Sequence, residues 1–342
     1  MIREPEFWWR PGGGALLTPL AAIYGGIAAR RMRRPGRRAA VPVICIGNFT
    51  TGGTGKTPAA IAVAQLLQSA REQPFFLSRG YGGRFAGPLQ VDPSRHGARE
   101  VGDEPLLLAR VAPAVIARDR FAGAQLAQSA GAGVIVMDDG FQNPSLAKTL
   151  SILMVDARRG IGNGRVIPAG PLRAPLGVQL ARAQALVSVG ADAGAAGLVT
   201  TARDRGLTVF HARIEPDPAA VAAIGRRKVL AFAGIGDPEK FFATLAAAGI
   251  DIAERAAFPD HHRYSAVDAR ALLTRAQDSD LMPVTTEKDL ARLAGETSGD
   301  PQLAALAKDT RVLPIRLVID EEDAFRDLVL EAVKTARRTA TA

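Results

Sequence analysis

One segment restricts the folds open to this chain more than any other: residues 41–57 read VPVICIGNFTTGGTGKT. The apolar run Val41–Ile46 predicts a buried strand, and it leads into a glycine-rich turn that ends in Gly55, Lys56 and Thr57. In such a turn backbone N–H groups surround phosphates, the lysine reaches the terminal phosphates, and the hydroxyl joins a Mg²⁺ shell. The sequence therefore predicts a nucleoside triphosphate site whose residues are Thr50, Thr51, Gly52, Gly53, Thr54, Gly55, Lys56 and Thr57.

This turn departs from the general pattern G-x-x-x-x-G-K-[ST] at its first position, where Thr50 replaces glycine. Gly52 and Gly53 supply the close backbone approach instead. The alternative is a chance Gly-Lys-Thr in an ordinary loop. The strand before the turn and the apolar run Ala59–Ala64 after it favour the phosphate-binding interpretation.

From residue 41 onward, short apolar runs alternate with helical patterns, which predicts a parallel sheet with helices on both faces. The expected strands are Val41–Ile46, Pro74–Ser78, Ala114–Ala117, Val134–Met137, Ser151–Val155 and Ala185–Val189, and the expected helices are Thr57–Ala70, Glu104–Arg110 and Arg120–Ala130. In such sheets ligands bind at the carboxyl ends of the strands.

The second half of the chain predicts a smaller α/β lobe. Residues 191–206 are rich in Ala and Gly and are expected to form a loop or hinge, and Leu207–Ile214 alternates like an exposed strand. A new strand–helix pattern starts near Lys228, with further strands expected at Pro283–Thr286 and Val312–Val318. The expected division is therefore 1–40, an apolar and basic segment; 41–206, the nucleotide-binding core; and 207–342, a linker strand and the smaller lobe.

Composition and charge narrow the class of protein. Hydrophobic residues make up 47% and charged residues 23% of the chain, which are globular values. The single cysteine, Cys45, excludes an internal disulfide and fits a reducing compartment. Residues 1–40 hold eight arginines against two glutamates, which accounts for six of the nine net positive charges. A nucleic-acid-binding protein would spread such charge over a folded face, so no nucleic-acid partner is expected.

The basic charge lies beside an uncharged stretch, Ala15–Ala29. As a helix this stretch would be about 22 Å long, shorter than the roughly 20 residues that a bilayer crossing needs. Trp8, Trp9 and Tyr24 are residue types that settle among lipid headgroups. We expect a helix at the membrane surface, with its arginines on anionic headgroups. The alternative is a helix packed on the protein's own core, followed by a solvated arginine tail.

A second nucleotide motif follows the expected strand at residues 134–137. That strand ends in Asp138 and Asp139. An aspartate at the end of an apolar strand is a Mg²⁺ partner in P-loop enzymes. Asp138 is expected to be linked to the metal, and Asp139 to share the ion or orient water.

Arginines and an acid follow other strands. Arg79, Arg118, Arg120 and Arg173 are expected to bind phosphate or an anionic substrate, or else to be solvated. Asp103 opens an apolar helix and is interpreted either as a helix cap or as an acid acting on a substrate hydroxyl.

Two of the four histidines, His261 and His262, are adjacent in the second lobe. No cysteine or further histidine cluster supports a zinc site, so a histidine from this lobe is expected to orient or tune Asp103. The polar run Thr285–Asp289 either binds nucleotide or joins the lobes by ion pairs.

Together these motifs resemble the tetraacyldisaccharide 4′-kinase family, the lipid A kinases of Gram-negative bacteria. The resemblance covers nearly the whole chain. Beside the N-terminal segment it rests on GNFTTGGTGKT (47–57), SRGYGG (78–83), GDEP (102–105), ARDR (117–120), DDGFQ (138–142), IPAGPLR (167–173), FPDHH (258–262) and TEKD (286–289). The joint order of these motifs makes the match specific.

The resemblance implies an ATP- and Mg²⁺-dependent kinase that phosphorylates the 4′-hydroxyl of an acylated glucosamine disaccharide 1-phosphate. It places the enzyme on the cytoplasmic face of the bacterial inner membrane, with no obligatory protein partner. It implies that Asp103 accepts the proton, paired with His261, and that Asp139 takes part in catalysis. Thr57 and Asp138 would hold Mg²⁺, while Gln142 and the four arginines would contact substrate or phosphate.

One position departs from the family pattern. Many members carry Glu after the arginine of the PLRE segment, where this chain has Ala174. A contact made by that glutamate must be made differently here. The alternative classes are a membrane-associated ATPase switch that positions a partner protein and a regulatory nucleotide-binding module. Neither would need an acceptor-side acid and histidine.

Overall fold

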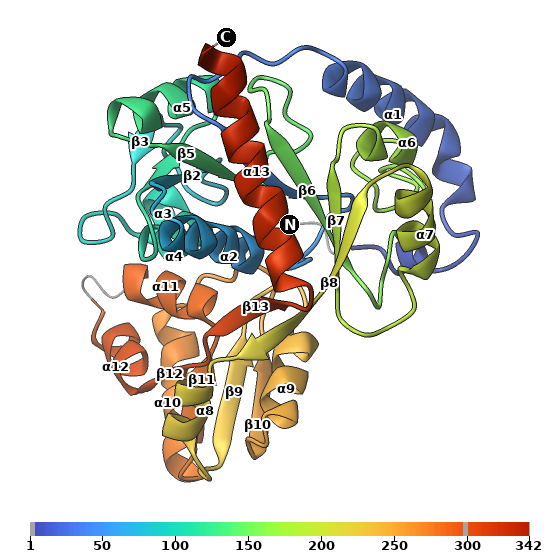
Figure 1. The fold of residues 1–342 in the computed structure, drawn as a ribbon. Helices are drawn as coiled ribbons and strands as arrows, with labels where there is room; N and C mark the ends of the chain where they lie inside the picture. The colour runs from blue at the N-terminus through green and yellow to red at the C-terminus, as the bar shows by residue number, and fades with distance from the viewer. Residues whose placement is uncertain (1–3, 297–299, 342) are drawn as a thin grey trace.

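The computed structural model describes residues 4–296 and 300–341 of the chain. It contains two sheets, each flanked by helices, and Figure 1 shows the smaller lobe beneath the larger one. The P-loop and Asp103 belong to the larger lobe and His261 to the smaller one, so the fold determines how these residues meet.

The larger sheet has nine strands in the order β13-β8-β7-β6-β1-β5-β2-β4-β3. These strands are β1 (Val43–Asn48), β2 (Pro74–Ser78), β3 (Leu89–Gln90), β4 (Ala114–Ile116), β5 (Val134–Asp138), β6 (Leu150–Asp156), β7 (Ala185–Val189), β8 (Thr208–Pro216) and β13 (Ile315–Ile319). In the described part of the chain only the edge strands β3 and β13 pair antiparallel. Central strand β1 is buried along its whole length, as expected for a parallel strand covered on both faces.

Helices cover both faces of this sheet, which confirms the expected fold class. One face packs against α2 (Lys56–Ser69), α4 (Asp103–Ala109) and α13 (Glu322–Thr341). The other packs against the end of α1 (Thr18–Met32) and against α5 (Arg120–Ser129), α6 (Leu176–Leu180) and α7 (Ala196–Asp204). Short helices η1 (Glu6–Trp9), η2 (Ala15–Leu17) and α3 (Ala98–Val101) precede α1 and α4.

The smaller lobe contains a four-stranded parallel sheet in the order β10-β9-β11-β12. Its strands are β9 (Val229–Ala233), β10 (Ile252–Ala257), β11 (Met282–Thr285) and β12 (Arg311–Val312). Helices α8 (Pro218–Ile224) and α9 (Pro238–Ala247) pack on one face, and α10 (Ala266–Asp278), α11 (Glu287–Glu296) and α12 (Pro301–Asp309) on the other.

The division expected at residue 206 differs from the observed sheet pairing. Strand β8 pairs parallel with β7, and β13 pairs antiparallel with β8, so both belong to the larger sheet. Helix α13 then packs on the larger lobe through Phe325, Val329 and Val333. The four-stranded lobe is therefore an insertion between β8 and β13, because the chain returns to its first sheet after β12.

Two local expectations were wrong. Residues 191–206 contain helix α7 rather than only a loop, because Leu198 and Ala202 lie four residues apart and pack together on the sheet. The run expected as one strand at Val312–Val318 is divided between β12 and β13, which belong to different sheets.

Helix α1 lies on the outside of the larger lobe (Figure 1). Its small residues Ala21, Gly25 and Ala29 are buried, at intervals of four residues that place them on one face. The opposite face leaves large apolar side chains exposed, namely Leu20, Ile23, Tyr24 and Ile27, and Leu16 of η2 is exposed just before them. In residues 4–296 and 300–341 no helix has the length and apolar character that a membrane span needs.

The tryptophans do not follow the expectation for headgroup residues. The Trp8 indole N–H donates to the Pro168 carbonyl over 3.0 Å, and the Arg159 guanidinium lies 5.0 Å from the Trp9 ring centre. Both tryptophans are half-buried against the body of the protein. They attach the N-terminal segment to the loop after β6, while Tyr24 remains exposed.

Candidate functional site

The glycine-rich turn after β1 has the geometry of an anion cradle. Gly52 and Gly55 have φ values of +94° and +82°, which side-chain-bearing residues rarely adopt. Gly55 caps α2, which begins at Lys56, so the free N–H groups of the first helical turn lie beside the loop. A Cβ added to Gly53 would meet no atom of the described residues within 4 Å. The turn can therefore admit a phosphate close to its backbone.

Two buried glutamine contacts brace the start of this turn. Gln142 donates to the Asn48 carbonyl over 2.7 Å and to the Gln179 side chain over 3.0 Å. Gln179 donates in turn to the carbonyls of Phe49 and Ala174. The Gln142 amide group thus holds the end of β1, whereas the sequence suggested a substrate contact. Gln179 has no motif around it and was missed.

Asp138 and Thr57, which the sequence analysis expected to bind a metal together, lie in direct contact. The Thr57 hydroxyl donates to Asp138 Oδ2 over 3.4 Å, and both side chains are buried. Burial, followed by repulsion from Glu104 and Asp139, raises the pKa of Asp138 to about 7. Its Oδ1 has no hydrogen-bond partner among the described residues. A buried, unpartnered carboxylate oxygen beside a hydroxyl fits a hard divalent cation such as Mg²⁺.

Asp139 interacts with two cations of the same site. Arg173 donates to Asp139 Oδ1 over 2.6 Å, and the Lys56 ammonium lies 3.9 Å from the same oxygen. Burial acts to raise the pKa of Asp139, but Lys56 and Arg173 outweigh it and lower the pKa to about 2. The Asp139 carboxylate is therefore ionised at neutral pH. It orients Lys56 and Arg173 toward the phosphate cradle and is a poor proton acceptor.

Of the other arginines expected to bind phosphate, only Arg120 is buried. Its guanidinium donates to the Ala117 carbonyl over 2.5 Å, and its Nε has no partner among the described side chains and backbone groups. Burial, with repulsion from Arg79, lowers the pKa of Arg120, while Asp139 acts in the opposite direction. Arg79 and Arg118 are exposed. Arg120 thus adds a third cation to the site of Lys56 and Arg173.

Asp103, expected to act on the acceptor side, lies between the two lobes. Asp103 opens α4, and its side chain is only 3% exposed. His261, from the smaller lobe, places Nδ1 at 3.7 Å from Asp103 Oδ2. This distance is too long for a hydrogen bond, so the expected pair is close without being directly bonded. The His261 ring also lies 5.3 Å from the ring of Tyr81, which follows β2.

Arg292 of α11 holds the Asp103 carboxylate and was missed by the sequence analysis. Its Nε donates to Asp103 Oδ2 over 2.8 Å, and its second terminal nitrogen donates to the same oxygen. Arg292 also donates to Asp289 over 3.0 Å and to the Gly234 carbonyl over 2.5 Å. Burial acts to raise the pKa of Asp103, but Arg292, Lys288 and His261 outweigh it and lower the pKa. The spacing of Arg292 three residues after Asp289 indicates an ion pair on one helix face, but it gives no sign of the contact with Asp103.

The polar run Thr285–Asp289 joins the lobes, which decides between its two interpretations. Lys288 forms a 2.6 Å ion pair with Glu104 of α4, across the lobe boundary. Asp289 is fully buried and accepts hydrogen bonds from Tyr264, Thr286 and the Gly234 backbone. The second histidine, His262, contacts Asp268 over 3.2 Å at the start of α10 and lies outside this network. One strand–helix junction thus supplies the charges that hold α4 to the smaller lobe.

Ala174 is buried where many relatives were expected to carry Glu. Its side chain packs in the apolar cluster on the α6 and α7 face. The acidic groups that act on the P-loop charges come instead from β5 and α4, since Asp138, Asp139 and Glu104 all affect the pKa of Lys56.

The site is that of a P-loop enzyme. It has a glycine-rich cradle, a lysine–threonine helix start and an aspartate on the neighbouring strand. A second lobe contacts Asp103. The sequence model of the family described as tetraacyldisaccharide-1-P 4′-kinase matches residues 14–334. The chain belongs to this family.

Named relatives match over almost the full length. A tetraacyldisaccharide 4′-kinase of Rhodopseudomonas palustris strain BisA53 is 55% identical over 98% of this chain and 97% of its own length. The enzyme of the same name from Nitrobacter winogradskyi is 50% identical over 98% of this chain and 99% of its own. The crystal structure of LpxK from Aquifex aeolicus in complex with ATP matches with a TM-score of 0.71 at 27% identity, covering 94% of this chain and 99% of that one. These matches confirm the fold class and the kinase class.

Proposed function

We propose that this protein transfers the γ-phosphate of ATP to the 4′-hydroxyl of a tetraacyl glucosamine disaccharide 1-phosphate, forming lipid IVA. The family assignment gives the reaction class, and one observation supports it in this chain. Asp103 is buried beside Glu104. Burial lowers the pKa of Lys56 and raises that of Asp138, and the charge of Glu104 acts on both groups, opposing the shift of Lys56 and adding to that of Asp138. An acceptor-side carboxylate therefore lies close to the phosphate cradle, as transfer to a hydroxyl requires.

The reaction assigns a separate role to each charged group. The substrate hydroxyl oxygen bonds to the γ-phosphorus, the bridging bond to the β-phosphate breaks, and ADP leaves. Asp103 accepts the hydroxyl proton. Its lowered pKa makes it a weak base, so its main contribution is to align the hydroxyl for a loose transition state that needs little base help.

The cations of the cradle stabilise the charge on the transferring group. Lys56, Arg120 and Arg173 contact phosphate oxygens, and the N–H groups of the turn hold the β- and γ-phosphates. Thr57 and Asp138 would hold Mg²⁺, which would neutralise negative charge on the phosphates. Asp139 fixes the positions of Lys56 and Arg173. His261 lies beside Asp103 and Tyr81, where it orients the acid toward the sugar.

The membrane surface is the proposed location of the reaction, on the cytoplasmic face of the bacterial inner membrane. The exposed face of α1 presents Leu20, Ile23 and Ile27, with exposures from 57% to 64%, and Leu16 of η2, just before it, is 97% exposed. Arginines follow at its end, which is the arrangement of an interfacial helix. The acyl chains of the substrate remain in the bilayer while α1 holds the site at the sugar. Binding of nucleic acid and an obligatory protein partner form no part of this proposal.

The deciding experiment measures transfer from radiolabelled ATP to a tetraacyl disaccharide 1-phosphate in detergent micelles with Mg²⁺. A bisphosphorylated lipid product is expected. Asp103→Ala and His261→Ala are each expected to lower transfer strongly with little change in folding by circular dichroism. ATP hydrolysis without lipid phosphorylation would contradict the proposal and favour an ATPase switch. Near-normal turnover in both variants would remove their assigned roles.

A further inference from the structure

A basic cavity lies at the end of the large sheet's strands that is opposite to the phosphate cradle. Its volume is about 840 Å³, within the range of small-molecule sites. Ser151 is near the start of β6, and Gln184 directly precedes β7, so the cavity lies at the amino ends of these parallel strands. The cradle follows the carboxyl end of β1, and the cavity therefore cannot be part of the ATP site.

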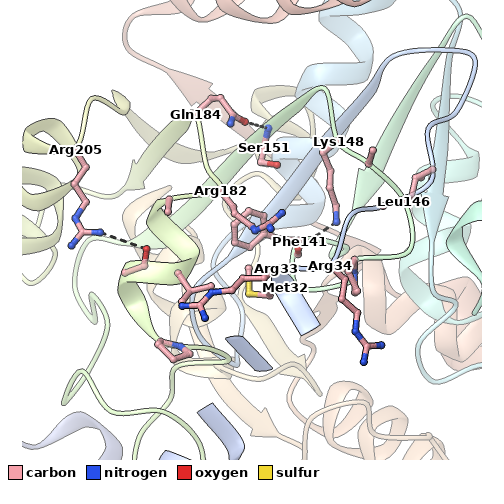
Figure 2. Close-up of a pocket in the computed structure, with 17 residues that line it drawn as sticks. Met32, Arg33, Arg34, Phe141, Leu146, Lys148, Ser151, Arg182, Gln184 and Arg205 are labelled. Carbon is pink, nitrogen blue, oxygen red and sulfur yellow. Dashed lines mark hydrogen bonds between the residues drawn. The ribbon is translucent and has the colours of Figure 1, made fainter. Parts of the chain in front are cut away.

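Five cationic side chains line this cavity. They are Arg33, Arg34, Lys148, Arg182 and Arg205. None of its lining residues in the described chain is Asp or Glu. Figure 2 shows Arg33, Arg182 and Lys148 gathered around Phe141, with Arg205 at the side, where it donates to the Gly177 carbonyl. A cluster of cations without carboxylates is a site for a multiply charged anion.

The cavity's inner cation is held without a counter-ion. Lys148 is half-buried and donates to the carbonyls of Phe141 and Asn143. Burial lowers its pKa, and repulsion from Arg182 lowers it further. In residues 4–296 and 300–341, no carboxylate forms an ion pair with any of the five cations, so their charges remain available to a ligand.

The backbone fixes the two halves of the cavity relative to each other. Arg37 N–H donates to the Ser145 carbonyl over 3.1 Å, and Ala147 N–H donates to the Arg37 carbonyl over 2.9 Å. Gly36 packs so closely on this segment that an added Cβ would lie 2.5 Å from the Ala147 nitrogen. The segment carrying Arg33 and Arg34 is thus tied to the segment carrying Lys148 before any ligand binds.

The position of the cavity identifies the source of the anion. Met32, the last residue of α1, and Arg33, the next residue, both line it. The exposed apolar face of α1 ends one turn earlier at Ile27. A membrane that receives this face would place its headgroups at the mouth of the cavity.

We propose that this cavity binds the phosphate of an anionic phospholipid headgroup, at a site separate from the catalytic centre. This inference rests on the membrane location given under the proposed function. It goes further, because it requires one localised phosphate site lined by these five cations rather than a diffuse attraction of basic residues to the surface. A headgroup held here would fix the rotation of the protein about α1, and would thus orient the catalytic site toward the bilayer.

The test compares vesicles of matched surface charge by sedimentation. Phosphatidylcholine vesicles contain either phosphatidylglycerol or a fatty acid, so that only one set offers an anionic phosphodiester. The wild-type protein is expected to bind the phosphatidylglycerol vesicles more tightly. Arg33→Ala combined with Arg182→Ala is expected to weaken that binding by about 25-fold, roughly fivefold for each basic residue at the surface, and to abolish the preference.

Two exposed arginines of the smaller lobe supply the matched control. Arg226→Ala combined with Arg227→Ala removes the same charge from the loop between α8 and β9 and is expected to change the affinity less than twofold. Equal losses in the two double variants, or a preference that survives in the cavity variant, would overturn the site. Inorganic phosphate that binds wild-type protein but leaves vesicle binding unchanged would assign the cavity to free phosphate instead. Transfer by the wild-type protein in detergent micelles tests the proposed function separately, so the two can fail independently.

Discussion

Replacing Arg292 with alanine gives the sharpest test of how the two lobes share charge. The Arg292 side chain is 6% exposed, and it is paired with Asp103 and Asp289, whose side chains are 3% and 0% exposed. Removing one partner of a buried ion pair leaves an uncompensated charge and costs about 3–5 kcal/mol. Arg292→Ala is therefore expected to lower the free energy of unfolding by about that amount. Urea denaturation followed by circular dichroism measures it.

The pH dependence supplies an independent check with a defined sign. In the wild-type protein the pKa of Asp103 lies below its ordinary value of 3.8, so its contribution to stability is present above that pH and is lost only in acid. Without Arg292, burial is the leading influence, and the pKa of Asp103 is expected to rise. A raised carboxyl pKa reverses the sign, so the variant loses stability as pH increases from the unfolded-state pKa toward the raised one. The deficit of Arg292→Ala should therefore grow as pH rises above about 4 and level off above the raised pKa.

Two controls separate this ion pair from loss of packing. Arg292→Lys keeps the charge and should recover part of the stability and of the transfer rate. Arg270→Ala removes an exposed arginine from α10 of the same lobe and should change stability by less than about 0.5 kcal/mol. The reasoning would be refuted if Arg292→Ala lost less than about 1 kcal/mol. A coupling energy near zero between Arg292→Ala and Asp103→Asn in a double-mutant cycle would refute it equally.

Three further perturbations test other parts of the site. Lys56→Ala is expected to lower transfer by about 10²-fold or more, measured as kcat with radiolabelled ATP, because one charge-stabilising contact contributes on that order; a loss under threefold would contradict its role. Because the pKa of Asp138 is about 7, a proton competes with Mg²⁺ for this carboxylate below that pH. Mg²⁺ should therefore raise the thermal midpoint of unfolding more at pH 8 than at pH 6, and Asp138→Asn should abolish this difference. An equal effect of Mg²⁺ at both pH values would exclude the metal role of Asp138. Leu20→Glu combined with Ile23→Glu should reduce sedimentation with vesicles at least tenfold while leaving the circular dichroism spectrum unchanged, because two large apolar side chains are exposed on α1; unchanged sedimentation would show that this face does not enter the bilayer.

The sequence was most informative where local pattern and burial agree. The bounds of β2 and β7 were predicted to the residue, because both are short apolar runs buried on both faces. The P-loop and the aspartates after β5 were found for a similar reason, since their chemistry requires fixed residue types at fixed spacing. Helix α7 was missed because the Ala- and Gly-rich composition of residues 191–206 indicates a loop. In the structure, the packing of Leu198 and Ala202 is enough to form a helix there.

Partners that are distant in the sequence could not be predicted. Strand β13 pairs with β8, which lies about a hundred residues earlier in the chain. The sequence of β13 alone does not show whether it joins the sheet of β8 or that of β12. Arg292 is one arginine among many on amphipathic helices, and only the approach of α11 to α4 gives it a function. Gln179 is similar, because its two carbonyl partners come from the β1 turn and from its own helix start.

The insertion of the smaller lobe has a mechanical consequence. The chain leaves the large sheet at Pro216 and returns at Ile315, and these two residues are directly opposite each other in the antiparallel pair of β8 and β13. The chain thus connects the smaller lobe to the larger one through two adjacent strands, β8 and β13. A twist of these two strands would rotate the whole smaller lobe. Such a rotation would separate Arg292 from Asp103 and Lys288 from Glu104 in the same movement. These two ion pairs therefore oppose the movement, and only a twist that breaks both leaves Asp103 without Arg292.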